Sequence, residues 1–215
     1  MAVATAYLQE RETAFTERQA SVLEVGLKLL VDGGDKGLTT AGLAKAAGCS
    51  KESLYKWFGD RDGILEAIVS YQASKVRGVD ERATPASKEA FEAALTAFAE
   101  DLLNVLMSET SLALNRLAIG SVKGGSADLG PLLLEKGKRR IEARAVHLLT
   151  HGRRQRFIAY DDAGKAYNLL YGLVVGDMHI RALLGDLEKP DNGQVRTKAV
   201  EAIQQFLTLH APALS

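Results

Sequence analysis

The sequence predicts an all-α protein in which a three-helix head with a helix-turn-helix precedes a longer helical domain. Apolar residues recur at helical spacing along most of its 215 residues, and no segment alternates as a strand would. Residues that favour helix starts stand before several of these segments. Gly48 interrupts two short helical segments at a point where the chain must turn sharply.

The first elements follow from local signals. Residues 1–15 are predicted to form a flexible arm. Thr16 and Gln19 form a capping box at the start of a helix that we expect to run to about Val31. The run Asp32-Gly33-Gly34 is expected to stop that helix.

Two short helices complete the three-helix head, and a longer linking helix follows them. Thr39 is predicted to begin a helix that carries Leu43 inward, and Ser50 to begin the helix that ends near Phe58. A further helix is expected from Asp60 to about Val76, which would link the head to the rest of the chain.

We place the domain boundary at a linking stretch that contains glycine and proline. It divides a head of residues 16–76 from a second domain of residues 77–215. The second domain is predicted to contain helices over about 87–107, 112–119, 131–150, 163–184 and 194–209.

Bulk composition narrows the class of protein. The net charge is zero, which argues against a uniformly basic protein but allows a local basic patch. Cys49 is the single cysteine, so no intrachain disulfide can form. No apolar stretch approaches the length of a membrane span, and we expect a cytoplasmic protein without membrane contact.

A helix held at the surface by a sharp corner fits the major groove of DNA. Lysines on the second short helix, Lys51 and Lys56, can neutralise phosphates, while Ser53, Tyr55 and Trp57 can donate hydrogen bonds to them. The alternative is an ordinary helical hairpin with solvated lysines. That alternative does not explain two outward aromatic residues within one turn.

At these residues the chain resembles the TetR/AcrR family of transcriptional regulators, from about Arg18 to Val69. The motifs are Leu38-Thr39-Thr40, Ala47-Gly48-Cys49-Ser50 and Leu54-Tyr55-Lys56-Trp57-Phe58, followed by Arg61. The resemblance implies a dimeric DNA-binding regulator. The DNA contacts that it implies are Thr40, Ser50, Lys51, Glu52, Ser53, Tyr55, Lys56, Trp57 and Arg61.

Two positions depart from the usual family pattern. Cys49 replaces a common valine, and we interpret it as a small core residue rather than a redox sensor. Glu52 places an acid in the second short helix. It could accept a hydrogen bond from a cytosine amino group, or it could pair with Lys56 one turn later.

The resemblance also implies a small-molecule pocket in the second domain, for which Phe98, Leu102, Met107 and Arg116 are the candidates. The apolar stripe could equally be plain core. Arg116 could hold an acidic ligand, or it could pair with Glu109 or Asp101.

The predicted helices nearest the C-terminus are the candidates for a homodimer interface. Small residues at four-residue spacing would let two helices approach closely, and the faces could instead be buried within one subunit. The interface candidates are Leu170, Gly172, Val174, Gly176, Met178, Ile203 and Phe206.

We therefore expect a sequence-specific regulator, a repressor released from a palindromic operator by an unknown small-molecule effector. A regulator without an effector is one alternative. A helical enzyme or small-molecule-binding protein with an incidental helix-turn-helix is the other, but no catalytic motif supports an enzyme. His147 and His151 lie one turn apart without a third ligand nearby, so no metal or cofactor is expected.

Overall fold

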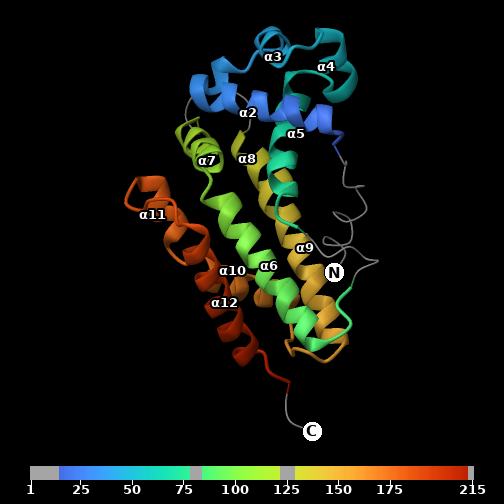
Figure 1. Cartoon of the computed structure of the whole chain (residues 1–215), viewed down its shortest axis with the longest axis vertical. Coiled ribbons are helices and arrows are strands. Elements are labelled where there is room, and N and C mark those ends of the chain that lie inside the picture. Colours follow the sequence, from blue (N-terminus) through green and yellow to red (C-terminus); the bar gives the residue numbers. More distant parts are fainter. Residues whose placement is uncertain (1–14, 78–83, 122–128, 213–215) are drawn as a thin grey trace. The chain divides into compact units, whose positions relative to one another are not determined.

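The computed structural model describes residues 15–77, 84–121 and 129–212, and these residues contain helices but no strand (Figure 1). The predicted all-α class is therefore confirmed. The predicted arm of residues 1–15 lies outside the described residues except for Phe15. Two compact units can be distinguished, and the chain passes between them more than once.

The first unit, called the head unit here, contains the described parts of residues 10–75 and 108–140. Hydroxyl and carboxylate caps begin its N-terminal helices, as the sequence predicts: Thr16, Thr39, Ser50 and Asp60 each accept a backbone N–H. Its elements are α2 (Glu17–Gly37), α3 (Thr40–Ala47), α4 (Lys51–Phe58), α5 (Arg61–Ser74), α7 (Glu109–Ser121), α8 (Leu129–Leu132) and the π-helical turn η2 (Leu133–Lys138).

The element α2 runs to Gly37, but its first helical segment is interrupted near the predicted stop. It continues beyond Val31 to Gly37, with a kink at Gly34, whose φ of +61° is the non-helical conformation that glycine adopts easily. The glycine run therefore interrupts the helix close to where the sequence predicts its end, and a short helical segment follows.

The core of the head unit combines residues from both parts of the sequence. Leu114 of α7 is 2% exposed and packs in one cluster with apolar residues of the first four helices. The cluster includes Val22, Leu23, Leu27, Leu30, Leu43, Leu54, Ile64, Leu65 and Ile68. Helix α7, which we assigned to the second domain, thus belongs to the compact unit that carries the helix-turn-helix.

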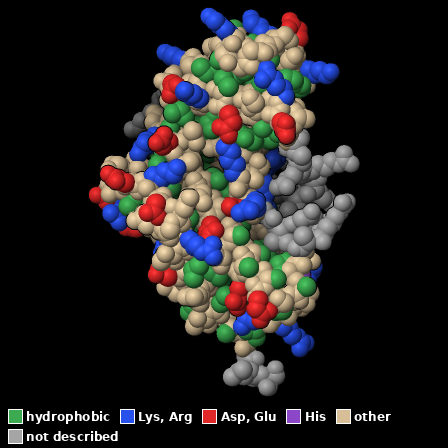
Figure 2. All heavy atoms as spheres, in the orientation of Figure 1, with side chains coloured by type: hydrophobic (Ala, Val, Ile, Leu, Met, Phe, Trp, Pro, Cys, Tyr) green, Lys and Arg blue, Asp and Glu red, His purple; other side chains and the backbone are tan. Residues whose placement is uncertain are grey.

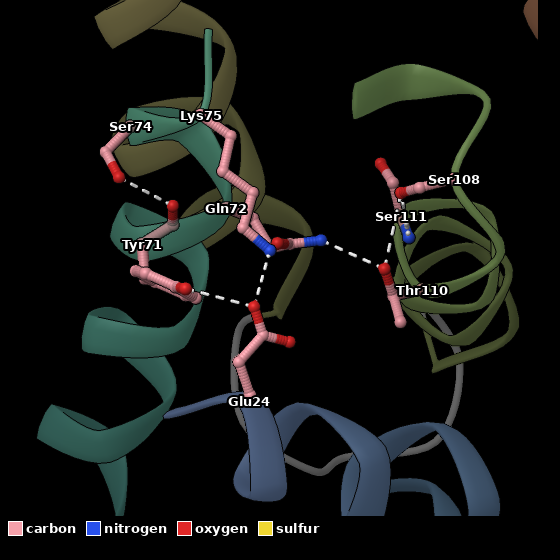
Figure 3. A network of polar contacts seen from close by, with 8 residues as sticks. All are labelled: Glu24, Tyr71, Gln72, Ser74, Lys75, Ser108, Thr110 and Ser111. Atoms are coloured by element: carbon pink, nitrogen blue, oxygen red, sulfur yellow. Dashed lines mark hydrogen bonds and ion pairs between the residues drawn. The ribbon is translucent and has the colours of Figure 1, made fainter. Parts of the chain in front are cut away.

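Polar contacts join α5 to α2 and α7 within the head unit (Figure 3). Glu24 on α2 accepts a hydrogen bond from the Tyr71 hydroxyl at 3.0 Å and pairs with Lys75 at 2.8 Å. Toward α7, the Gln72 amide donates to the Thr110 hydroxyl at 3.0 Å. These bonds tie the end of α5 to both neighbouring helices.

The second unit, called the body unit here, contains the described parts of residues 76–107 and 141–212. Helix α12 packs against α6 and α10, and large apolar side chains such as Phe91, Tyr167 and Phe206 are fully buried. Its helices are α6 (Lys88–Leu106), most of α9 (Arg139–Arg154), α10 (Ala163–Val175), α11 (Met178–Leu184) and α12 (Asn192–Leu209).

The structure corrects two helix boundaries in the C-terminal half of the chain. The segment 163–184, predicted as one helix, breaks at Gly176, where φ of +51° ends α10 before α11 begins. The predicted helix over 131–150 continues to Arg154 and follows the turns α8 and η2 without a loop. None of the helices in the described ranges is both long and apolar enough to cross a membrane.

Candidate nucleic-acid interface

The corner between α3 and α4 is made by Gly48 in the left-handed conformation, with φ 60° and ψ 47°. Its N–H and that of Cys49 turn back to the carbonyl groups at the end of α3, the Cys49 bond to Ala44 measuring 3.0 Å. A residue with a Cβ would be strained there. The sequence prediction of a glycine corner is therefore confirmed. At this corner the chain turns from α3 into α4 (Figure 1).

The N-terminus of α4 uses its polar residues to cap itself. The Ser50 hydroxyl accepts the Ser53 N–H at 3.1 Å, and the two serine hydroxyl oxygens lie 3.0 Å apart. Hydrogen bonds from its own backbone N–H and from Ser50, with the nearby charge of Lys51, lower the pKa of the Glu52 carboxyl below its usual value. Glu52 is thus an anion at the helix start.

Ser50 is thus a local hydrogen-bond partner of Glu52, whereas the sequence suggested either a cytosine or Lys56. Among the described residues, no ion pair joins Glu52 to Lys56. The carboxylate remains exposed beside Lys51, and whether it contacts cytosine stays a prediction.

The outward face of α4 presents Lys51, Tyr55 and Lys56. All three are exposed, and Tyr55 retains 55% of its accessible surface, which is unusual for an aromatic side chain. Figure 2 shows lysine and arginine side chains projecting from the end of the head unit that carries α3 and α4. Positive charge and an aromatic hydroxyl on one exposed helix face suit phosphate binding.

Three other predicted DNA-contact residues are partly buried or hydrogen-bonded within the protein. Thr40 and Trp57 are half-buried, and Trp57 packs against the core of the head unit with its ring 6.0 Å from that of Phe58. The Arg61 Nε donates to the Leu38 carbonyl at 3.1 Å, just before α3. Arg61 therefore braces the loop between α2 and α3, a role that helix periodicity does not indicate.

Sequence reasoning missed a second arginine at the same site. Arg18, in the first turn of α2, donates through Nη2 to the carbonyl oxygens of Ala47 and Gly48, at 2.8 and 2.9 Å. These two carbonyls form the corner itself. A sequence separation of 29 and 30 residues leaves no local signal for such a contact.

The predicted effector-pocket residues fall into both units. Phe98, Leu102 and Met107 are 3%, 1% and 1% exposed in the body unit, so their stripe is core packing in this structure. Arg116 is exposed on α7 of the head unit and has a polar partner. Their grouping around one ligand therefore stays a prediction.

Four of the predicted dimer residues lie inside the subunit. Leu170, Val174, Ile203 and Phe206 are at most 2% exposed, because α10 and α12 pack these faces against the body unit's own core. This is the alternative in which the faces are buried within one subunit. Gly172 and Gly176 are exposed and Met178 is half-buried, so these three remain available to a partner.

Several buried polar atoms of the body unit have no hydrogen-bond partner among the described residues. They include the Tyr167 hydroxyl and Nε2 of His147 and His179. Burial, together with the nearby Tyr171 and Glu142, raises the pKa of the Tyr167 hydroxyl far above its ordinary value, so it stays protonated. His151 is engaged instead, with Nε2 lying 2.8 Å from the Pro85 carbonyl oxygen.

Two family descriptions match the chain. Residues 22–68 match the bacterial regulatory proteins of the TetR family, and residues 93–212 match the C-terminal domain of the AefR-like transcriptional repressor. The first range covers the helix-turn-helix and the second most of the remaining chain. No curated protein gave a significant match.

Solved structures agree with this assignment. A TetR transcriptional regulator from Agrobacterium tumefaciens is 50% identical, with a TM-score of 0.75 over 93% of this chain and 97% of the other. Two further structures share the fold. A putative TetR-family regulator from Mesorhizobium loti is 22% identical, with a TM-score of 0.68 over 92% of this chain and 100% of the other. The flavonoid-responsive regulator FrrA is 21% identical, with a TM-score of 0.64 over 92% of this chain and 98% of the other.

The matched ranges, the half-identical relative and the exposed basic helix lead to one conclusion. This chain belongs to the TetR family and is a DNA-binding transcriptional regulator.

Proposed function

We propose that the protein is a dimeric repressor that binds a palindromic operator through α4 and is released by a small-molecule effector. The observation that carries the DNA contact is the exposed face of Lys51, Tyr55 and Lys56 beyond the Gly48 corner. Lys56 and Tyr55 contact phosphates, while Lys51 and Glu52, at the start of α4, face base edges. The proposal includes no catalytic step.

The proposed dimer face is an exposed stripe along α10 and α11. Leu169, Ile180 and Leu184 are 37%, 53% and 78% exposed, an uncommon exposure for aliphatic side chains. Within α10, exposed Gly172 and half-buried Leu173 lie three and four residues after Leu169, and exposed Gly176 stands at the break before α11. A second copy of the chain is the proposed occupant, because the family resemblance implies a homodimer.

The dimer determines the form of the operator. Two recognition helices related by a two-fold axis enter successive major grooves, about 34–36 Å apart along the DNA. The bound sequence should accordingly be a palindrome. Quantitative footprinting on DNA from upstream of the protein's own gene tests this, with a shuffled duplex of equal length as control. Protection without two-fold symmetry, or equal affinity for both duplexes, would contradict the proposal.

We place the effector in the body unit, near the Tyr167 hydroxyl. A buried hydroxyl without a partner costs free energy, about 1–3 kcal/mol, unless something hydrogen-bonds to it. A mainly apolar ligand with one neutral polar group would supply that partner. Because Glu142 lies near Tyr167, an uncharged hydroxyl or amide suits the site better than the acidic group that Arg116 suggested.

Binding linkage gives the effector test. A ligand that weakens operator binding must itself bind more weakly when operator is present, by the same factor, typically about 5–150-fold. Small molecules are screened by thermal shift, and each hit is titrated with and without operator. A hit that binds with the same affinity with and without operator is not an inducer. If every hit behaved in this way, release by an effector would be contradicted.

A further inference from the structure

The Arg18 side chain reaches the helix-turn-helix corner from α2. One guanidinium nitrogen, Nη2, lies within hydrogen-bond distance of two consecutive carbonyl oxygens, those of Ala47 and Gly48. Nη2 carries two hydrogens, so each carbonyl can receive its own bond. The contact joins α2 directly to the junction of α3 and α4.

These two carbonyl groups need an external partner. The last carbonyls of a helix have no intrahelical N–H, and they form the negative end of the helix dipole. At the end of α3 the backbone turns through Gly48, so the following N–H groups satisfy only the earlier carbonyl groups of Ala44 and Lys45. The Arg18 guanidinium supplies two charge-assisted hydrogen bonds to the remaining carbonyl groups, those of Ala47 and Gly48.

Gly48 by itself does not fix the direction of α4. Glycine occupies several backbone conformations at similar energy, so the residue that permits the corner also permits other angles. A clamp that spans the corner removes this freedom. We propose that Arg18 is a positioning residue for DNA recognition, which holds α4 at the angle required for the major groove without contacting DNA.

This inference rests on the proposed docking of α4, and it makes a distinctive prediction. A tilted recognition helix loses base contacts before it loses general attraction to the DNA backbone. Removing the clamp should therefore weaken operator binding by roughly 5–150-fold, the range that correctly placed base contacts supply. Binding to unrelated DNA and the salt dependence should stay the same.

The experiment compares Arg18→Met, which keeps the length of the side chain but removes its donors, with Arg18→Lys, which retains charge and donors. Lys28→Met is the matched control, because Lys28 is exposed on the same helix and the same charge is lost. Each variant is measured for operator affinity, affinity for a shuffled duplex, salt slope and melting temperature.

Positioning predicts that Arg18→Met loses operator affinity selectively, that Arg18→Lys recovers part of it, and that Lys28→Met resembles the parent protein. An equal loss on both duplexes with a salt slope lower by about one unit would identify a phosphate contact and overturn the inference. A lower melting temperature with unchanged operator affinity would overturn it too, since the clamp would then serve only stability.

Hydrogen exchange in the DNA-free protein tests the clamp independently of any operator. The Cys49 amide, bonded to the Ala44 carbonyl, should exchange faster in Arg18→Met than in Lys28→Met. Equal exchange in the two variants would overturn the inference. If the Cys49 amide exchanged faster in Arg18→Met but the parent protein itself bound no DNA, the clamp would be supported and the proposed function refuted.

Discussion

Gly63 lies against the backbone of Phe58 so closely that a Cβ atom at Gly63 would overlap the Phe58 carbonyl oxygen. The Gly63 N–H also donates to the Asp60 carboxylate at 2.9 Å, which begins α5. The end of the recognition helix α4 is thus packed directly on the first turn of α5, and only glycine fits.

Replacing this glycine should destabilise the head unit. Gly63→Ala is expected to lower the free energy of unfolding by about 1–3 kcal/mol, because the overlap is with backbone that must shift. Chemical denaturation followed by circular dichroism measures the effect. Gly120→Ala on α7 is the control: a Cβ there meets nothing within 4 Å, so this variant should gain up to about 1 kcal/mol. Equal behaviour of the two variants would contradict the packing argument.

Phosphate contacts predict a specific salt signature. Lys56→Ala should weaken binding to operator and to unrelated DNA alike and flatten the dependence of affinity on salt by about one unit. Lys51→Ala should instead relax preference at one base pair, by roughly 1–3 kcal/mol. Fluorescence anisotropy over a salt series measures both, with Lys189→Ala as a charge-matched control outside the head unit. Parent-like slopes for Lys56→Ala would exclude that contact.

The dimer face is best tested at Gly172. This residue is exposed, and a Cβ placed there meets nothing within 4 Å in the subunit, so a side chain at this position can start into open space. The variant is Gly172→Leu. We expect it to shift the equilibrium toward monomer, because the added bulk meets only a partner. Light scattering over a concentration series measures this. Gly176→Leu is a poorer test, since φ of +51° strains leucine in the monomer as well. An intact Gly172→Leu dimer would place the interface elsewhere.

The Glu24 carboxyl makes part of the stability depend on pH. Burial alone would raise its pKa, but hydrogen bonds from Lys75 and Tyr71 and the charge of Lys75 outweigh burial and lower the pKa below 4.5. Glu24 therefore stabilises the folded state above the unfolded pKa, near 4.5, and this contribution is lost as pH falls through the lower, folded value.

Glu24→Gln should accordingly cost about 0.2–1 kcal/mol near neutral pH, the range of a partly exposed ion pair, and the difference from the parent should shrink below about pH 4.5. Urea denaturation at a series of pH values and fixed protein concentration measures it. Glu188→Gln makes the same charge change at an exposed residue and should show no such trend. A difference that grew toward low pH would refute the assignment.

Tyr167→Phe should stabilise the effector-free protein by about 1 kcal/mol, because it removes a buried hydroxyl that has no partner. The same variant should bind the effector more weakly if that hydroxyl contacts it. Thermal unfolding without ligand measures the change in stability. Thermal unfolding with each effector found by screening then measures the change in effector binding. Tyr55→Phe, exposed on α4, should leave stability within about 0.5 kcal/mol of the parent. A less stable Tyr167→Phe would mean that the hydroxyl is satisfied.

The sequence by itself determined the helices of the head, their caps and the corner between α3 and α4. These features depend on neighbours a few residues away. Thr16, Thr39, Ser50 and Asp60 each cap with a residue three positions on, and Gly48 needs only its own backbone freedom. The exposed face of α4 follows from the same helical spacing.

Only the tertiary structure decided which faces meet each other and which remain available to a partner. Leu170 and Leu169 are adjacent in sequence, yet one is buried in the subunit and the other is exposed. Arg18 donates to carbonyl groups 29 and 30 residues away and Arg61 to one 23 residues away, contacts that no local pattern indicates, and the DNA contact of Arg61 stays a prediction. Burial and long-range hydrogen bonds depend on segments that are distant in sequence, so helical periodicity can reveal an apolar face but not its partner.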